Sequence, residues 1–226
     1  MRKTNLYSIT TLILVLFIVL FYLSGCNLLI MSMYGFKSSD DVLSKKEIEN
    51  IAFSYGIKPS EIYFLQRSYI DFFDSIGMIH NHNLRSCDTS QISQQFKNHF
   101  QPLQILFFDN TGKLVSFLNN CYSGGFPNFK WNRNHELDYI PAKGNTPLDS
   151  LISFGDLLRC INNIEGKYLD KDSCINQNYS IVVFWTTFMG RQSKRLIHII
   201  KNKYSHEKEL NINILFVNVD CCAYRF

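Results

Sequence analysis

The sequence predicts an α/β domain, and two patterns carry this prediction. First, residues 179–220 hold a β-prone apolar run, an amphipathic helical stretch and a second β-prone run, in the order of a βαβ unit with parallel strands. Second, two short apolar runs at 103–108 and 114–118 are separated by turn-forming residues, which is typical of a β-hairpin. Amphipathic helices expected upstream would pack on a sheet built from these strands.

The N-terminal residues have the three parts of a secretory signal. Two basic residues precede an uncharged apolar run at 12–23, and the small residues Ser24 and Gly25 follow before Cys26. The tetrapeptide Leu-Ser-Gly-Cys at 23–26 resembles the lipobox of bacterial lipoproteins. This resemblance implies cleavage after residue 25 and attachment of membrane lipid, such as palmitate, to Cys26.

An uncleaved signal anchor is the alternative, because the apolar stretch continues past Cys26 to Met33. The stretch from residue 12 to residue 33 is long enough to cross a bilayer, which requires about 20 apolar residues. Both interpretations place the bulk of the chain outside the cytoplasm, in a compartment of the bacterial cell envelope such as the periplasm.

Charge and composition restrict the class of partner. Loss of residues 1–25 removes Arg2 and Lys3, so the formal net charge falls from +4 to +2. So small a charge argues against nucleic acid, which requires a concentrated basic stripe. The chain is 46% apolar and 15% aromatic, enough to bury a core. We therefore expect a membrane lipid at Cys26 and an unspecified envelope protein or peptide as partners.

These observations divide the chain into four segments. They are a signal peptide at 1–25, a lipid anchor and tether at 26–43, a helical region at 44–100 and an α/β domain at 101–226. The helical region is expected to form a hairpin of two helices. Ser44 and Glu47 cap the first helix, and Pro59 begins the second, whose apolar residues continue at helical spacing to Ile76.

The α/β domain holds further predicted elements beside the β-hairpin. Residues 119–146 are rich in Asn, Gly and Pro and predict a long surface loop anchored by Trp131 and Tyr139. Residues 148–164 have apolar side chains on one face and predict a helix. The βαβ unit is expected to consist of a strand at 179–186, a helix at 190–204 and a strand at 211–220.

The βαβ unit resembles the thioredoxin family. Residues 182–187, Val-Val-Phe-Trp-Thr-Thr, look like the strand that leads into the family's active site. Residues 188–194 occupy the place of its Trp-Cys-Gly-Pro-Cys-Lys motif, and the strand at 214–220 ends in a similar Asn-Val-Asp. The resemblance covers residues 147–220 and implies a thioredoxin-like fold.

Two departures from the family argue against its redox activity. Dithiol exchange requires a thiolate at a helix N-terminus and a second thiol that resolves the mixed disulfide. Here Met189 and Gln192 stand at these two positions, and neither side chain can form a thiolate. We therefore expect a non-catalytic thioredoxin-like domain that acts as a binding or structural module of a cell-envelope lipoprotein.

The chain also stops directly after the second strand of the βαβ unit, at Phe226. The family's cis-proline loop and final antiparallel hairpin have no counterpart after this strand. If the earlier hairpin at 103–118 joins the same sheet, the domain is a rearranged α/β domain. Otherwise the chain is a truncated copy without a function of its own.

Six cysteines remain beside Cys26, and they allow fifteen disulfide pairings. They are Cys87, Cys121, Cys160, Cys174, Cys221 and Cys222. Cys221 and Cys222 follow the last strand, at the carboxyl end where open α/β sheets place their sites. A vicinal disulfide between them would be strained and easily reduced, which would suit a redox switch.

We favour two independent cysteines, one buried and one paired elsewhere, because adjacent side chains on an extended chain point to opposite faces. Cys221 and Cys222 are the candidate residues for a second possible function, a membrane-tethered thiol-disulfide oxidoreductase with non-standard cysteines. In that case Cys221 would pair with Cys222 or with Cys174.

Other chemistry finds little support in the sequence. His80 and His82 lie near Cys87 and Asp88, but no third and fourth ligand follows at a fixed spacing, so we predict no metal site. No phosphate loop, Gly-x-Ser-x-Gly or His-Glu-x-x-His motif is present. We therefore assign no catalytic residue and no cofactor.

Overall fold

The structure is a computed structural model that describes residues 43–83, 89–120, 131–169, 177–205 and 210–225. The predicted signal peptide and Cys26 lie outside these ranges, as do Cys87, Cys121 and Cys174. No helix within the described ranges is long and apolar enough to span a membrane.

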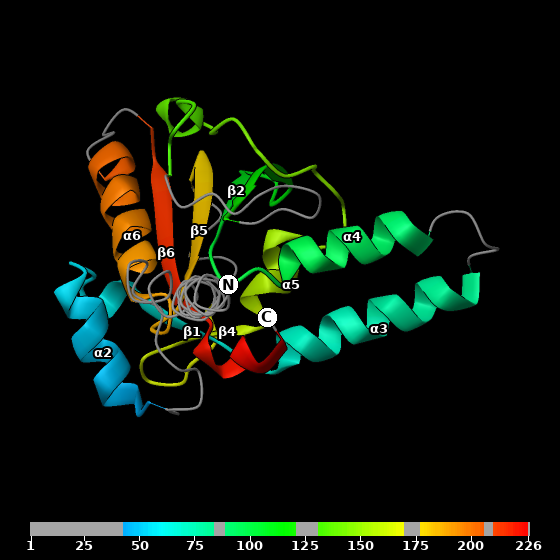
Figure 1. The fold of residues 1–226 in the computed structure, drawn as a ribbon, viewed down its shortest axis with the longest axis horizontal. Coiled ribbons are helices and arrows are strands. Elements are labelled where there is room, and N and C mark those ends of the chain that lie inside the picture. Colours follow the sequence, from blue (N-terminus) through cyan, green and yellow to red (C-terminus); the bar gives the residue numbers. More distant parts are fainter. Residues whose placement is uncertain (1–42, 84–88, 121–130, 170–176, 206–209, 226) are drawn as a thin grey trace, which may run out of the picture.

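A six-stranded mixed sheet forms the centre of the domain, with strand order β3-β2-β5-β6-β1-β4 (Figure 1). The strands are β1 (Ile62–Leu65), β2 (Gln104–Asp109), β3 (Leu114–Asn119), β4 (Ile161–Asn163), β5 (Tyr179–Trp185) and β6 (Ile212–Asn218). β5 and β6 are parallel, with Val183 opposite Phe216, and α6 (Gly190–Tyr204) connects them. The predicted βαβ unit is therefore confirmed, and so is the α/β fold class.

The β-hairpin joins this same sheet. β2 pairs antiparallel with β3 and with β5, where Ile105 lies opposite Val183. The turn between β2 and β3 is stabilised by Asp109, whose carboxylate accepts hydrogen bonds from the amides of Thr111 and Lys113. Gly112 adopts a φ of 82°, which only glycine takes without strain. The expected rearrangement, in which the hairpin precedes the βαβ unit in the chain and completes its sheet, is confirmed.

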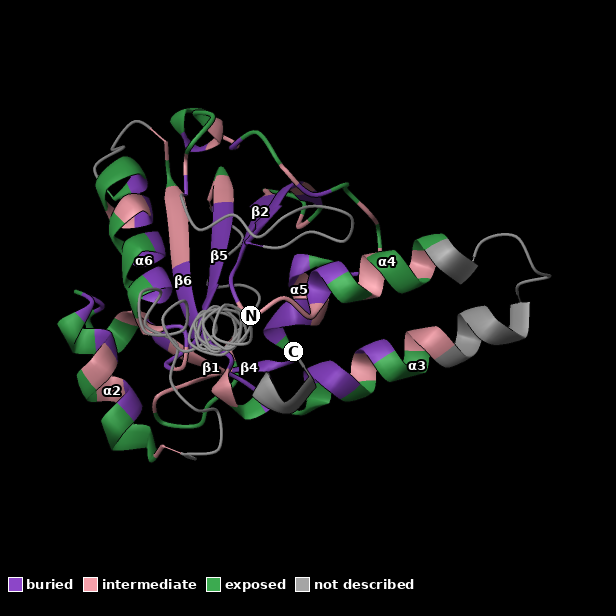
Figure 2. Ribbon diagram, viewed as in Figure 1, coloured by how far each residue is buried: buried purple, intermediate pink, exposed green. Residues whose placement is uncertain are grey.

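The two faces of the sheet bury separate cores. Along β5, Ile181 and Val183 point into one core and Val182 and Phe184 into the other, because side chains alternate along a strand. α2 (Lys45–Ser54) and α6 cover the first face. α5 (Phe154–Leu158), the start of α3 (Ser68–Asn83) and the end of α4 (Thr89–His99) cover the second, and the rest of α3 and α4 projects away from the sheet (Figure 1). Figure 2 shows that the helices present buried residues to the sheet and exposed residues outward.

The first helix, α2, begins as predicted, since Ser44 and Glu47 form a capping box. The second predicted helix, at 59–76, is wrong over its first turns. A 3-10 turn, η1 (Pro59–Glu61), leads into β1, and α3 begins only at Ser68. Residues 62–64 pair with β6, and their β-branched and aromatic side chains suit a strand, so tertiary pairing outweighs the helical spacing. α3 packs against α4, where the rings of Phe73 and Phe96 lie 5.6 Å apart.

The helix predicted at 148–164 is also too long. A capping box of Ser153 and Asp156 begins α5, which ends after five residues. The chain then forms β4, with Ile161 opposite Leu65 of β1. β4 forms because β1 provides hydrogen-bond partners for it. The sequence analysis predicted a helix where β1 lies, so it gave residues 161–163 no strand to pair with.

Both edges of the sheet are covered by the chain itself. The side chain of Asn145 accepts from the amide of Asn119 and donates to its carbonyl, and the amide of Thr146 donates to the carbonyl of Phe117. At the other edge, Tyr168 forms an isolated bridge with residue 162 of β4. Covered edges protect a sheet against pairing with another chain.

The predicted loop at 119–146 is only partly anchored as expected. Trp131 is buried, but the ring of Tyr139 is exposed, with the ammonium of Lys143 3.9 Å above it. The hydroxyl of Tyr204 on α6 donates to the carbonyls of Leu137 and Tyr139, so the backbone of the loop is held instead.

Candidate functional site at the carboxyl ends of the parallel strands

The turn between β5 and α6 is the place where the thioredoxin resemblance locates an active site. The hydroxyl of Ser193, in the first turn of α6, donates to the carbonyl of Thr186 and accepts from its amide. The hydroxyl of Thr186 accepts from the amide of Met189, the N-cap residue of α6. Three hydrogen bonds therefore fix the turn against the start of the helix.

Met189 and Gln192 lie inside the domain at this turn. Met189 is 4% exposed and belongs to the same core cluster as Trp185 and Leu196, and Gln192 is 1% exposed. Neither amide atom of the Gln192 side chain has a hydrogen-bond partner. The two positions that carry thiols in the thioredoxin family, which this segment resembles, are here occupied by unreactive side chains and are closed to solvent.

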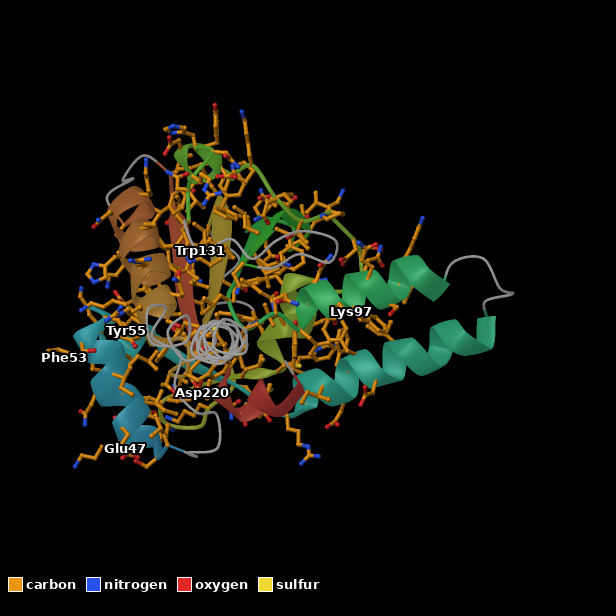
Figure 3. All side chains as sticks on the ribbon, viewed as in Figure 1. Glu47, Phe53, Tyr55, Lys97, Trp131 and Asp220 are labelled. Atoms are coloured by element: carbon orange, nitrogen blue, oxygen red, sulfur yellow. The ribbon has the colours of Figure 1, made fainter. Side chains whose placement is uncertain are left out.

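Asp220 ties the end of β6 to the turn after β5. Its carboxylate accepts hydrogen bonds from the amide of Thr187 at 2.9 Å, from the hydroxyl of Thr187 at 2.7 Å and from the side-chain amide of Asn218 at 3.1 Å. Burial raises the pKa of Asp220 above its ordinary value, although these hydrogen bonds oppose the rise. Figure 3 shows Asp220 and Tyr55 at the same end of the sheet. Burial, and then the charge of Asp220, raise the pKa of Tyr55.

Cys221 and Cys222 follow Asp220 in the short 3-10 helix η4 (Asp220–Arg225). Their sulfur atoms are 3.3 Å apart, and both thiols are free. Cys221 is exposed and donates a hydrogen bond to the carbonyl of Leu65 at the end of β1, whereas Cys222 is 1% exposed. The interpretation in which the two side chains point to opposite faces is therefore wrong, because the backbone here is helical rather than extended.

The two thiols differ in acidity. A hydrogen bond with Cys222 lowers the pKa of the Cys221 thiol, although partial burial of its sulfur beside Leu65 and the charge of Asp220 oppose this effect. The same hydrogen bond, together with burial, raises the pKa of Cys222 far above its ordinary value. Cys221 therefore loses its proton first and would be the nucleophile of the pair.

Cys160 is a third thiol at the same end of the sheet, which the sequence interpretation did not single out. It is buried and lies in the same core cluster as Cys222. Its carbonyl accepts from the amide of Gln66, directly after β1, and burial raises the pKa of its thiol. Only the pairing of β4 with β1, which the sequence did not predict, brings Cys160 to this place.

A buried histidine–carboxylate pair is a second feature that the sequence did not reveal. Nε2 of His99 lies 3.0 Å from both carboxylate oxygens of Asp149, and the two side chains are 0% and 2% exposed. The imidazole stacks on Phe117, with ring centroids 4.9 Å apart, and its Nδ1 has no partner. Because the pair is sealed from solvent, its role is to join the end of α4 to the segment before α5.

Two surface depressions are separate from the residues above. One, of about 460 Å³, lies between α5 and the segment at Tyr168 and Leu169. The other, of about 340 Å³, lies between η1 and the start of β6, beside Tyr204. Neither is lined by a cysteine or a histidine.

The described residues include no cluster of three or more histidine, cysteine or acidic side chains that could hold a metal ion. His80 and His82 belong to the last turns of α3, and Cys87 and Asp88 fall outside the described residues.

Comparison of the chain with protein-family models, with curated proteins and with solved structures gave no match. A proposal of function therefore depends on the geometry of the site.

Proposed function

We propose that the chain is a bacterial cell-envelope protein, held at a membrane by lipid on Cys26, whose thioredoxin-like domain is a binding or structural module. The observation that carries the non-catalytic part of this proposal is the burial of Met189 and Gln192 at the turn between β5 and α6.

Burial matters here as much as residue type. A thiolate that attacks a disulfide of another molecule must reach the surface and is stabilised at a helix N-terminus. Met189 instead packs in the core beside Trp185, and the hydroxyls of Thr186 and Ser193 hold the turn in this position. A substrate disulfide would have to displace core side chains to reach residue 189.

The covered sheet edges restrict how a partner binds. Asn145 and Thr146 occupy the free edge of β3, so a partner peptide would not add to this edge as a further strand. The outward face of α6 is available instead. It carries the exposed side chains of Lys194, Arg195 and His198, and α6 contains no acidic residue. A partner with an acidic surface would complement this face.

An insulin-reduction assay tests the non-catalytic part of the proposal. The full chain in detergent, with dithiothreitol as reductant, is expected to give no turnover above the background of the reductant alone. A dithiol oxidoreductase serves as positive control. Turnover that disappears in a Cys221→Ser variant would contradict the proposal, because it would mark the chain as an enzyme.

Metabolic labelling with a fatty-acid analogue tests the anchor. The wild-type chain is expected to incorporate the label, and a Cys26→Ser variant is expected to lose it. Failure of the wild type to incorporate label, with the N-terminus retained, would favour the uncleaved signal anchor.

A further inference from the structure

The sulfur atoms of Cys221 and Cys222 are close enough to react with each other. They lie 3.3 Å apart, and a disulfide requires about 2.05 Å, so closure needs a movement of little more than 1 Å. Both cysteines belong to the first turn of η4, whose helical backbone holds the two side chains on the same side.

The surroundings place one sulfur outside and one inside. Cys221 is exposed at the carboxyl end of β1, where its thiol meets the carbonyl of Leu65. Cys222 lies beneath it in the core, 3.9 Å from the carbonyl of Gln66. Cys221, the exposed residue of the pair, is therefore the one that an external disulfide would meet first. This arrangement gives the two cysteines separate roles as attacking and resolving thiol.

We propose that Cys221 and Cys222 are a redox-active dithiol that another molecule's disulfide converts into a vicinal disulfide. This inference goes beyond the proposed binding role. Each oxidation event would convert the dithiol of the module into a disulfide once, which changes the state of the module but does not turn over a substrate.

The reaction proceeds by two exchange steps. The Cys221 thiolate attacks one sulfur of the external disulfide, whose S–S bond breaks and releases one thiolate, which takes up the proton that Cys221 gave up. The thiol of Cys222 then loses its proton and attacks the sulfur of Cys221, which releases the second external thiolate. The two protein thiols lose two electrons and two protons in total, and the external disulfide gains them as two thiols.

The acidity of the two groups supports this order. Cys221 is the more acidic thiol and attacks first. The hydrogen bond with Cys221 is the largest cause that raises the pKa of Cys222. Once Cys221 is bound in the mixed disulfide it carries no negative charge, so that cause is removed and Cys222 becomes easier to deprotonate for the second step.

A vicinal disulfide is suited to reversible oxidation. The Cα atoms of adjacent residues are about 3.8 Å apart, which is shorter than the 4.4–6.8 Å that unstrained disulfides span. Strain makes a disulfide easier to reduce. Oxidation would also withdraw the Cys221 thiol from the carbonyl of Leu65, so that η4 loses a contact with β1.

Mass spectrometry of the full chain in detergent tests the dithiol. The protein is equilibrated in mixtures of reduced and oxidised glutathione, quenched with acid, alkylated under denaturing conditions and digested with trypsin. The tryptic peptide 209–225 contains Cys221 and Cys222 and no other cysteine. As the mixtures become more oxidising, it is expected to lose both alkyl groups and to be two hydrogens lighter than the dithiol.

Three variants separate the roles. Cys222→Ser is expected to retain glutathione on Cys221, and Cys221→Ser is expected to remain reduced at Cys222. Cys160→Ser is the control and is expected to oxidise like the wild type. Alkylation of both cysteines in every mixture, or a disulfide that joins peptide 209–225 to another peptide, would overturn the proposal. So would loss of the vicinal disulfide in the Cys160→Ser variant.

The outcomes also separate this inference from the proposed function. A vicinal disulfide without insulin turnover supports both. A vicinal disulfide with turnover that requires Cys221 supports the dithiol and contradicts the non-catalytic module. Absence of the disulfide and of turnover contradicts the dithiol alone.

Discussion

The carboxylate of Asp220 accepts hydrogen bonds from both the amide and the hydroxyl of Thr187, which is 33 residues earlier in the chain. These two bonds join the ends of the neighbouring parallel strands β5 and β6. They also fix the residue that precedes Cys221. The stability of this corner of the domain should therefore depend on the ionisation of Asp220.

The first prediction concerns the pH dependence of stability. Burial raises the pKa of Asp220 in the folded chain above its ordinary value of 3.8. Between 3.8 and the folded pKa, the folded state therefore binds more protons than the unfolded state. The stability that protonation of Asp220 contributes is fully present below pH 3.8 and is lost as the pH rises through the folded pKa. Asp220→Asn removes this titration. We expect the free energy of unfolding of wild type minus variant to fall as the pH rises from 3.8 through the folded pKa, by at most about 1.4 kcal/mol per pH unit, and to level off above it.

Asp109→Asn is the matched control for this measurement. Burial opposes the shift, but hydrogen bonds from Thr111 and Lys113 lower the pKa of Asp109 below its ordinary value. Its stabilising contribution is therefore present above that value and is lost as the pH falls. Denaturant unfolding of both variants should give differences with opposite slopes. A flat difference for Asp220→Asn would contradict the prediction.

The second prediction concerns the closed site at the start of α6. A Met189→Cys, Gln192→Cys double variant restores the spacing of a dithiol motif, but both positions are buried. A thiol reagent would reach them only through local opening, and an opening that costs about 3 kcal/mol slows the reaction about 100-fold. We expect the two introduced thiols to be alkylated at least about 100-fold more slowly in the folded chain than in the unfolded chain. An Arg191→Cys variant, at an exposed neighbouring position, should react without protection. Equal rates at the two sites would show that the turn is open.

The parts of the fold that the sequence predicted are those whose pattern is local. The helix at 190–204 has apolar side chains at helical spacing over its whole length, and the hairpin at 103–118 has clear turn residues between its strands. The structure contains both, with bounds close to the prediction. β1 has only four residues and β4 three, and each is a strand because of the partner beside it. Their short sequences fit a helix equally well, so the pattern could not distinguish the two states.

The candidate site divides in the same way. The identity of Met189 and Gln192 at the thiol positions followed from the sequence, but their burial did not. The 3.3 Å separation of the sulfurs of Cys221 and Cys222 depends on the helical backbone of η4, which six residues at a chain end do not reveal. His99 and Asp149 are 50 residues apart and meet only because α4 and the segment before α5 pack together.

The third prediction concerns a close backbone approach. A Cβ atom on Gly144 would lie 2.9 Å from the carbonyl oxygen of Phe117, in the segment that covers β3. Because this neighbour is backbone, it cannot move aside cheaply. We expect Gly144→Ala to lower the free energy of unfolding by about 2–3 kcal/mol, the upper part of the usual cost of overpacking. At Gly166 a Cβ would meet no atom within 4 Å, but φ is 81°, so Gly166→Ala should cost only about 1 kcal/mol, from backbone strain alone. Equal losses for the two variants in denaturant unfolding would contradict the steric account.

The fourth prediction concerns the buried pair of His99 and Asp149. His99→Ala leaves the Asp149 carboxylate with only the hydrogen bond from the amide of Leu151, in a site closed to solvent, and it removes the ring that stacks on Phe117. An uncompensated buried charge costs about 3–5 kcal/mol, so we expect a loss of unfolding free energy in that range at neutral pH. His198→Ala is the control, because His198 is exposed on α6 and its loss should change stability by no more than about 0.5 kcal/mol.

A His99→Ala, Asp149→Leu double variant separates the two causes. Leucine has the same number and branching of heavy side-chain atoms as aspartate and carries no charge, so the variant removes the buried carboxylate but keeps the loss of the ring. If the unpaired charge dominates, the double variant is expected to be more stable than His99→Ala, since replacing a buried ion pair by apolar side chains is often neutral or stabilising. If it is no more stable than the single variant in denaturant unfolding, the loss comes from the missing ring and its contact with Phe117, and the pair serves packing rather than charge compensation.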